Sequence, residues 1–403
     1  MANEATTVGE RIRAARKMRG FTARQLADAV NISIPLLYKY EQGTRNPSNR
    51  MVIELAKALH IGPERLTGQP YMNGAEAESG VQAVIPDLRR VLWTYDRPEE
   101  SEAAPRPLEI LVAEMKHISQ MRRDCQYMPM GALLPSLLNE LSQVALSSTG
   151  QRKEQAFSTL ALGYRAANSL AHKLGYHDLS MTAIERVRWA AAHSGDPFME
   201  VVAEYLMLGA LLRQGTWDAA DRLLIELESK VHRIVAGGPW DNTSRGLLGS
   251  LVLKHVALKA RKGDVEGAMR AVEDAEEIAA ASGNVDGVYY ETSFGPANIR
   301  IHEVHAHLEL GAPSIAVERA EGFEPPEDMP GERRSHHYID LAAAQLASGD
   351  RAGSFESLRR ARSISPLHTR FHPVVRHTSA ALVRLDRAQH DTIAGFARWS
   401  GAI

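Results

Sequence analysis

Apolar residues recur every three or four positions through most of the chain, a spacing that places them on one face of an α-helix. The pattern is most regular between Val8 and Leu66, where turn and capping residues separate short helical stretches. From Leu108 onward, nearly every stretch repeats the pattern. The sequence therefore predicts an all-α fold, with five short helices in the first sixty or so residues and a long helical region after residue 107.

The breaks between the first helices carry specific capping signals. Thr22 and Gln25 have the spacing of a capping box, which begins a second helix after Gly20 ends the first. Ser33 can cap a third helix, and the turn before it contains Asn31, which tolerates positive φ. Two short helices joined by such a turn are typical of a helix-turn-helix, whose second helix enters the DNA major groove.

The segments QLADAVNI and SIPLLYKYEQGTRNPS resemble the Cro/cI-type (XRE) helix-turn-helix of bacterial and phage repressors. The shared features are Leu26-Ala27, Leu37, Tyr40-Glu41-x-Gly43 and Pro47-Ser48. The resemblance implies a DNA-binding domain over residues 8–66, here named the head, in which the third helix reads bases. The residues that it implies in DNA contact are Thr22, Arg24, Ser33, Ile34, Pro35, Tyr38, Lys39, Thr44, Arg45 and Asn46.

Charge separates the head from the rest of the chain. Residues 8–66 contain eleven Lys or Arg against five Asp or Glu, a net charge of +6, whereas the whole chain carries −2. A basic head on an acidic body favours attraction to phosphate at one end only. We therefore expect double-stranded DNA as a partner of the head.

Composition and motifs exclude several other classes of protein. No apolar run approaches the ~18 residues of a membrane span, and no signal peptide is recognisable. Cys125 is the single cysteine, so no disulfide can form within the chain. His302-Glu303-Val304-His305 has the wrong spacing for a zincin, and His368, His372 and His377 favour surface or packing roles over metal binding. We expect a cytoplasmic protein that is not an enzyme, with no metal and no cofactor.

Residues 67–107 have the composition of a linker with one short helix near Pro86 to Tyr95. This helix presents Leu88, Val91, Leu92 and Trp93, which we expect to dock onto the rest of the chain or onto a second subunit. The Gly- and Pro-rich segments on either side predict a flexibly tethered head.

Residues 108–403, here named the body, contain a repeat. Helical stretches end in glycine at 175, 215, 263, 311 and 349, and in four of the five a second helix with an alanine near its start follows. The pattern resembles tetratricopeptide (TPR) repeats, which stack into an α-solenoid with a concave groove; an irregular α-bundle is the alternative. Counting back from each glycine by the repeat register places these residues in the groove as effector contacts: Arg165, Tyr205, Arg213, Arg261, Asn298, His305 and His336.

Together the two halves resemble bacterial regulators in which a repeat groove senses an effector. The sequence predicts a homodimeric transcriptional regulator that binds a two-fold-symmetric operator and responds to a peptide or small molecule. The alternative is a protein-interaction scaffold or antitoxin-like module whose groove holds a partner protein. A palindromic operator would favour the hypothesis of a transcriptional regulator, and a co-purifying protein would favour the hypothesis of a scaffold.

Overall fold

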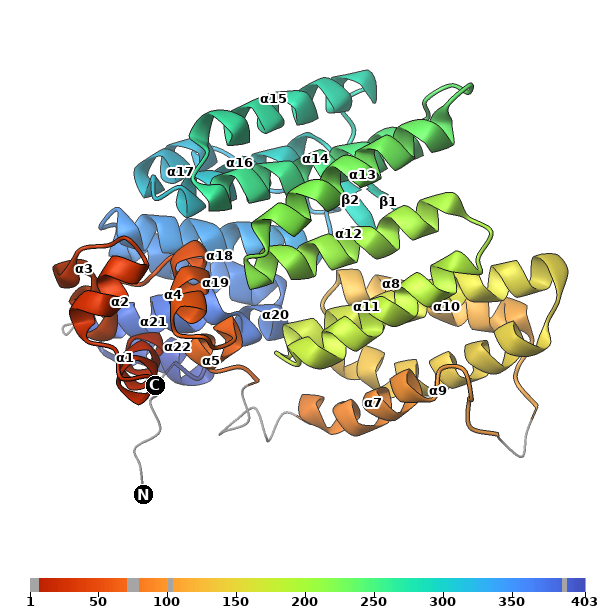
Figure 1. Cartoon of the computed structure of the whole chain (residues 1–403), viewed down its shortest axis with the longest axis horizontal. Helices are drawn as coiled ribbons and strands as arrows, with labels where there is room; N and C mark the ends of the chain where they lie inside the picture. The colour runs from red at the N-terminus through yellow and green to blue at the C-terminus, as the bar shows by residue number, and fades with distance from the viewer. Residues whose placement is uncertain (1–6, 71–79, 101–103, 386–389, 403) are drawn as a thin grey trace.

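The computed structural model of the chain describes residues 7–70, 80–100, 104–385 and 390–402 (Figure 1). Within these ranges the regular structure is helical apart from one two-stranded sheet, which confirms the predicted all-α class. The expected linker lies partly outside the described residues, at 71–79 and 101–103. None of the helices in the described ranges is long and apolar enough to cross a membrane.

The head forms the five short helices that the capping signals predict. The Thr22–Gln25 capping box is present, the Ser33 hydroxyl caps the third helix, and Asn31 has φ of 53° in the turn between them. A core that includes Ile12, Leu26 and other buried apolar side chains holds the helices together. The helices are α1 (Val8–Met18), α2 (Ala23–Ala29), α3 (Ile34–Glu41), α4 (Asn49–Ala58) and α5 (Pro63–Thr67).

A helix from the expected linker region packs against the body. Leu88, Val91 and Leu92 are buried there, whereas Trp93 is 65% exposed and does not dock on the body. Docking of Trp93 on a second subunit stays a prediction. Trp93 follows Leu92 directly, and one helical step of 100° turns its side chain away from the packed face. This helix is α7 (Ile85–Trp93), which η1 (Val81–Val84) precedes. The body begins with α8 (Leu108–Arg123) and α9 (Tyr127–Ser147).

Five helical hairpins follow, and each turns at one of the five repeat glycines, all of which have positive φ. Successive hairpins lie side by side and curve round, so that the C-terminal helices reach the head (Figure 1). The hairpins are α10 (Gly150–Lys173) with α11 (His177–Ala192), α12 (Pro197–Gln214) with α13 (Trp217–Val235), α14 (Asn242–Lys262) with α15 (Val265–Ala281), α16 (Pro296–Glu309) with α17 (Pro313–Ala320), and α18 (Gly331–Ala347) with α19 (Arg351–Ile364). The chain ends with α20 (Pro366–Phe371), α21 (Pro373–Leu385) and α22 (His390–Trp399).

A β-hairpin interrupts the helical body between α15 and α16. Its strands are β1 (Gly287–Tyr289) and β2 (Thr292–Phe294), paired antiparallel. Tyr290 and Glu291 form the turn, both with positive φ, as a type I′ turn requires. The sequence did not predict this hairpin because such turns usually carry Asn-Gly or a similar pair rather than Tyr-Glu.

The head is docked on the body, which corrects the expectation of a flexible tether. Ile53 lies against Gly215 and Arg50 against Gly263, and Gln69, just after the head, lies against Gly175. The head and the residues that follow it thus cross the turns of three successive hairpins. These turns accept the head closely because glycine has no Cβ; at Gly215 a Cβ would lie 2.4 Å from Cγ2 of Ile53.

Polar contacts reinforce the docking. The backbone N–H of Arg50 donates to the Glu309 carboxylate at 3.2 Å, and the Lys57 ammonium donates to the Gly215 carbonyl. On the far side of the head, the Arg384 guanidinium of α21 donates to the Gly43 carbonyl, in the loop after α3. The head is thus held by residues of α4 and by the loop after α3.

Candidate nucleic-acid interface and central cavity

The predicted DNA-binding surface lies on α3 and on the segments at its two ends. The Ser33 hydroxyl accepts a hydrogen bond from the first turn of α3 and begins the helix there. Leu37 packs into the head core, which leaves Pro35, Tyr38 and Lys39 exposed on the other face. In Figure 1, α3 lies at the outer edge of the molecule, and the loop that follows it is held by Arg384 of α21. The docked head therefore presents α3 outward.

Eight of the ten residues predicted to contact DNA are exposed, and Ile34 and Asn46 are half-buried. Ile34 packs against the head core, and Asn46 lines a small cavity between the head and α21. Asn46 therefore lies at the junction of head and body rather than on the open face of α3.

Three of the hydroxyl-bearing residues in this set hold the local backbone. Thr22 and Ser33 accept N-cap hydrogen bonds, and the Thr44 hydroxyl donates to the Lys39 carbonyl at 3.2 Å. Among the exposed cations of the set, Lys39 lies on α3 and Arg45 in the loop that follows it. Because α3 is the helix predicted to enter the major groove, we expect Lys39 to contact a base and Arg45, in the following loop, to contact a phosphate.

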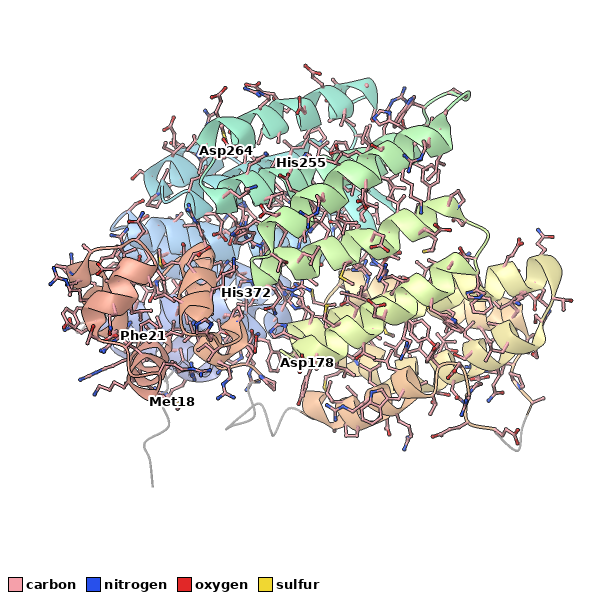
Figure 2. The ribbon with its side chains drawn as sticks, viewed as in Figure 1. Met18, Phe21, Asp178, His255, Asp264 and His372 are labelled. Carbon is pink, nitrogen blue, oxygen red and sulfur yellow. The ribbon has the colours of Figure 1, made fainter. Side chains whose placement is uncertain are left out.

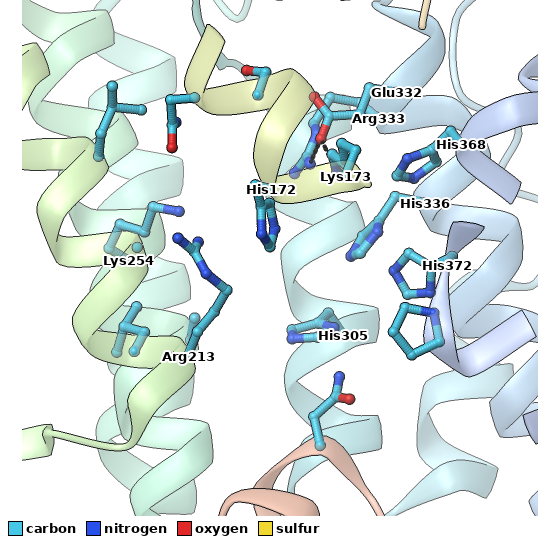
Figure 3. A pocket seen from close by; sticks show the side chains of 18 of the residues that line it. His172, Lys173, Arg213, Lys254, His305, Glu332, Arg333, His336, His368 and His372 are labelled. Carbon is cyan, nitrogen blue, oxygen red and sulfur yellow. Dashed lines mark hydrogen bonds and ion pairs between the residues drawn. The ribbon is translucent and has the colours of Figure 1, made fainter. Parts of the chain in front are cut away.

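A cavity of about 420 Å³, here named the central cavity, lies on the inner side of the body (Figure 3). The first helices of all five hairpins contribute to its walls, and Val52 and Ile53 of α4 close part of it from the head. At another wall, Glu291 of the β-hairpin receives ion pairs from Arg122 and Arg123, both at 2.6 Å. His372 lies near the centre of the molecule, between the head and α12 in the view of Figure 2.

The structure brings the seven predicted effector contacts together, since every one of them lines the central cavity. The repeat register places them on the first helices of successive hairpins, and the curvature of the stack turns that face inward. They are Arg165, Tyr205, Arg213, Arg261, Asn298, His305 and His336.

The central cavity is strongly cationic. Eight Lys or Arg residues line it against three Glu, and seven histidines add further nitrogen donors. The cations are Arg122, Arg123, Arg165, Lys173, Arg213, Lys254, Arg261 and Arg333. The carboxylates are Glu64, Glu291 and Glu332. Such an excess of positive charge inside low-dielectric walls favours an anionic ligand.

Three of these cations have no carboxylate within ion-pair distance among the described residues: Arg165, Arg213 and Lys254. One nitrogen of Arg165 donates to the Glu291 backbone carbonyl at 2.7 Å, and its Nε and Nη1 are buried without partners in the described structure. Burial lowers the pKa of Arg165 and of Arg213 to about 10, with neighbouring arginines acting in the same direction. Both remain charged at neutral pH, so each is available to an incoming anion.

Comparison with known proteins agrees with the geometry of the head. Residues 12–66 match the helix-turn-helix family. Over 63 residues the chain is 40% identical to YazB of Bacillus subtilis (strain 168), an uncharacterized HTH-type transcriptional regulator; the match spans 16% of this chain and 91% of that protein. The chain belongs to the helix-turn-helix family of transcriptional regulators. No solved structure matches this regulator.

Sequence reasoning missed several residues that line the cavity of this regulator. Lys254 lies seven residues before Arg261 on α14, two helical turns away, so it shares the same inward face. Its ammonium lies 4.6 Å from the centre of the Tyr205 ring. Helical periodicity alone could have identified Lys254. By contrast, no local pattern indicated that His368 and His372, expected as surface or packing residues, line the cavity beside His336.

Proposed function

We propose that this regulator binds its operator as a homodimer and that an anionic small molecule or short acidic peptide in the central cavity changes operator affinity. The observation that carries the proposal is the lining of the cavity, with eight cations against three carboxylates and one wall made by the DNA-binding head. A ligand can shift a conformational equilibrium only if it interacts differently with the two states. Because α4 forms part of the wall, a ligand in the cavity contacts the docked head directly.

The size of the cavity favours a small ligand over a folded partner protein. About 420 Å³ falls in the ordinary range of small-molecule sites, roughly 300–1,000 Å³. Arg165, Arg213 and Lys254 lie on the first helices of three successive hairpins and can approach one anionic group from different sides. This supports effector sensing rather than the scaffold alternative, and a regulatory rather than a catalytic role.

The test begins with recovery of genomic DNA bound to the purified full-length protein, which supplies an operator probe. Carboxylates, phosphates and acidic peptides are then screened, at constant ionic strength, for a rise in the melting temperature. We expect one chemical class to stabilise the protein and to change operator affinity by about fivefold or more.

Arg213→Ala is expected to abolish both responses while operator affinity without ligand stays unchanged. Arg222→Ala, an exposed arginine on α13 outside the cavity, is the matched control and should respond as the unchanged protein does. The proposal is wrong if no anion of the screen alters operator affinity, or if Arg213→Ala responds fully.

A further inference from the structure

Four histidines gather on the side of the cavity formed by α16, α18 and α20 (Figure 3), and the carboxylate of Asp340 lies against two of them. We name His305, His336, Asp340, His368 and His372 the histidine cluster. His336, His368 and His372 each place a ring nitrogen within 4.8 Å of those of the other two. A second triplet, His305, His336 and Asp340, meets the same limit. The cluster thus unites residues that are up to 67 positions apart in the chain.

Each ring of the first triplet has a buried nitrogen without a hydrogen-bond partner among the described residues. These atoms are Nδ1 of His336, Nε2 of His368 and Nδ1 of His372. Leaving a buried polar group unsatisfied costs about 1–3 kcal/mol. In a neutral imidazole, a ring nitrogen of this kind can keep a free lone pair. Neutral imidazoles of this kind are the commonest metal ligands in proteins.

Asp340 supplies the supporting contact that such a ligand set requires. Its buried carboxylate lies 3.4 Å from Nε2 of His336 and 2.9 Å from Nδ1 of His305. The negative charge on the Nε2 side of His336 favours the tautomer that carries its proton on Nε2, which leaves Nδ1 as the lone-pair donor. The other nitrogen of His368, Nδ1, lies 3.4 Å from the Tyr127 hydroxyl, which leaves Nε2 free. The surroundings therefore orient two of the three rings as ligands.

We propose that His336, His368 and His372 bind a divalent transition-metal ion of the zinc class. Asp340 orients the His336 ring for this role. In a tetrahedral site with bonds of 2.0–2.1 Å the ligand nitrogens lie about 3.4 Å apart, so the rings need to close by little more than 1 Å. Three histidines leave a fourth position, and all three rings line the central cavity. Water or an anionic ligand from the cavity completes the coordination.

The charges facing the cluster are compatible with a dication. Lys173 lines the cavity together with the cluster, and the Glu332 carboxylate pairs with it at 2.6 Å and with Arg333 at 3.2 Å. Arg261 lies 3.8 Å from the Glu309 carboxylate, near His305. Glu332 and Glu309 offset part of the positive charge that faces the cluster, and Asp340, which lies against both His305 and His336, adds a further carboxylate beside the ion.

The experiment titrates Co²⁺, and then Zn²⁺ in competition, into full-length protein freed of metal by a chelator. Nitrogen ligation in a tetrahedral site gives Co²⁺ an intense visible absorption. We expect one ion per chain, with affinity falling at least about tenfold in His336→Gln and in His372→Gln and about 10–100-fold in Asp340→Asn. His172→Gln removes a histidine from the same cavity outside the cluster and should bind as the unchanged protein does.

A replacement that keeps a ligand guards against loss of binding through misfolding. His372→Cys should retain Co²⁺ and add a thiolate-to-metal charge-transfer band in the near ultraviolet. The background is low because Cys125, the one natural cysteine, is buried. Absence of a stoichiometric ion in the unchanged protein, equal binding by the Gln variants, or a His372→Cys complex without the new band would each overturn the assignment. The titration uses neither DNA nor effector, so its outcome is independent of the proposed function.

Discussion

Arg16 and Glu41 form a bidentate ion pair inside the head, with N···O distances of 2.5 and 2.9 Å. Their side chains are 11% and 3% exposed. The pair joins α1 to the end of α3, so it fixes the helix on which the DNA-binding surface is predicted. Glu41 belongs to the motif from which the family resemblance was drawn, and the structure gives it this structural role.

Glu41→Gln should destabilise the head, because it leaves the Arg16 guanidinium with a neutral partner in a buried place. We expect a loss on the order of 3 kcal/mol in the free energy of opening, measured by hydrogen exchange of amides in α1 and α3. Glu266→Gln breaks the exposed Glu266–Arg270 pair of α15 and should cost less than about 1 kcal/mol. Equal protection in the two variants would contradict the role assigned to Glu41.

Lys39→Ala and Arg45→Ala should affect DNA binding differently. If Lys39 reads a base edge, its loss weakens operator binding by about 1–3 kcal/mol and spares nonspecific DNA. If Arg45 contacts phosphate, its loss weakens all sequences alike and lowers the salt dependence by roughly one ion. Fluorescence anisotropy on operator and scrambled duplexes, over a series of salt concentrations, separates the two. Unchanged operator affinity in both variants would move the DNA surface away from α3.

Among the elements, the repeated helix–glycine–helix unit has two kinds of turn. At Gly215 the turn supports the head, whereas at Gly311 nothing would lie within 4 Å of an added Cβ. Both glycines have positive φ, 69° and 77°, so the backbone requirement is the same and only the contact differs. Comparing an alanine substitution at Gly215 with one at Gly311 therefore distinguishes the effect of backbone strain at positive φ from the effect of lost contact with the head.

Gly215→Ala should loosen the head, because the new Cβ collides with Ile53 and Lys57. We expect amides of α4 to exchange roughly tenfold faster, as a loss of ~1.4 kcal/mol of docking would give. Gly311→Ala carries similar backbone strain and should leave exchange in α4 unchanged. Faster exchange of α4 in both variants would show that the effect is general destabilisation rather than undocking.

On the scale of the whole molecule, a basic head is seated on an acidic body in a defined orientation. In a symmetric dimer the bodies would then set both the distance and the rotation between the two DNA-binding surfaces. A docked head allows little adjustment, whereas a head on a flexible tether would tolerate several spacings.

Operator spacing tests this difference. Inserting about 5 base pairs between half-sites rotates one of them to the opposite face of DNA, and inserting about 10 restores the face but adds a helical turn of distance. We expect both insertions to weaken binding by at least tenfold in an anisotropy titration. Recovery with the longer insertion would mean that the heads undock when they bind DNA.

Short-range signals in the sequence determined the helices, the helix-turn-helix and the positions of the glycine turns. Capping, helical periodicity and positive φ depend on residues within a few positions of each other, such as Thr22 with Gln25. Repetition of one register then indicated which face of each hairpin points inward, although the ligand role of those residues stays a prediction.

Only the tertiary structure decided the features that join distant parts of the chain. The docking of Arg50 on Glu309, the ion pair of Arg122 with Glu291 and the meeting of His336 with His372 each join separate elements of the fold. Whether such groups meet depends on the summed curvature of the whole helical stack, which no local pattern encodes. For the same reason the sequence predicted a groove, but only the structure showed that the head closes part of it and that a histidine cluster lies in its wall.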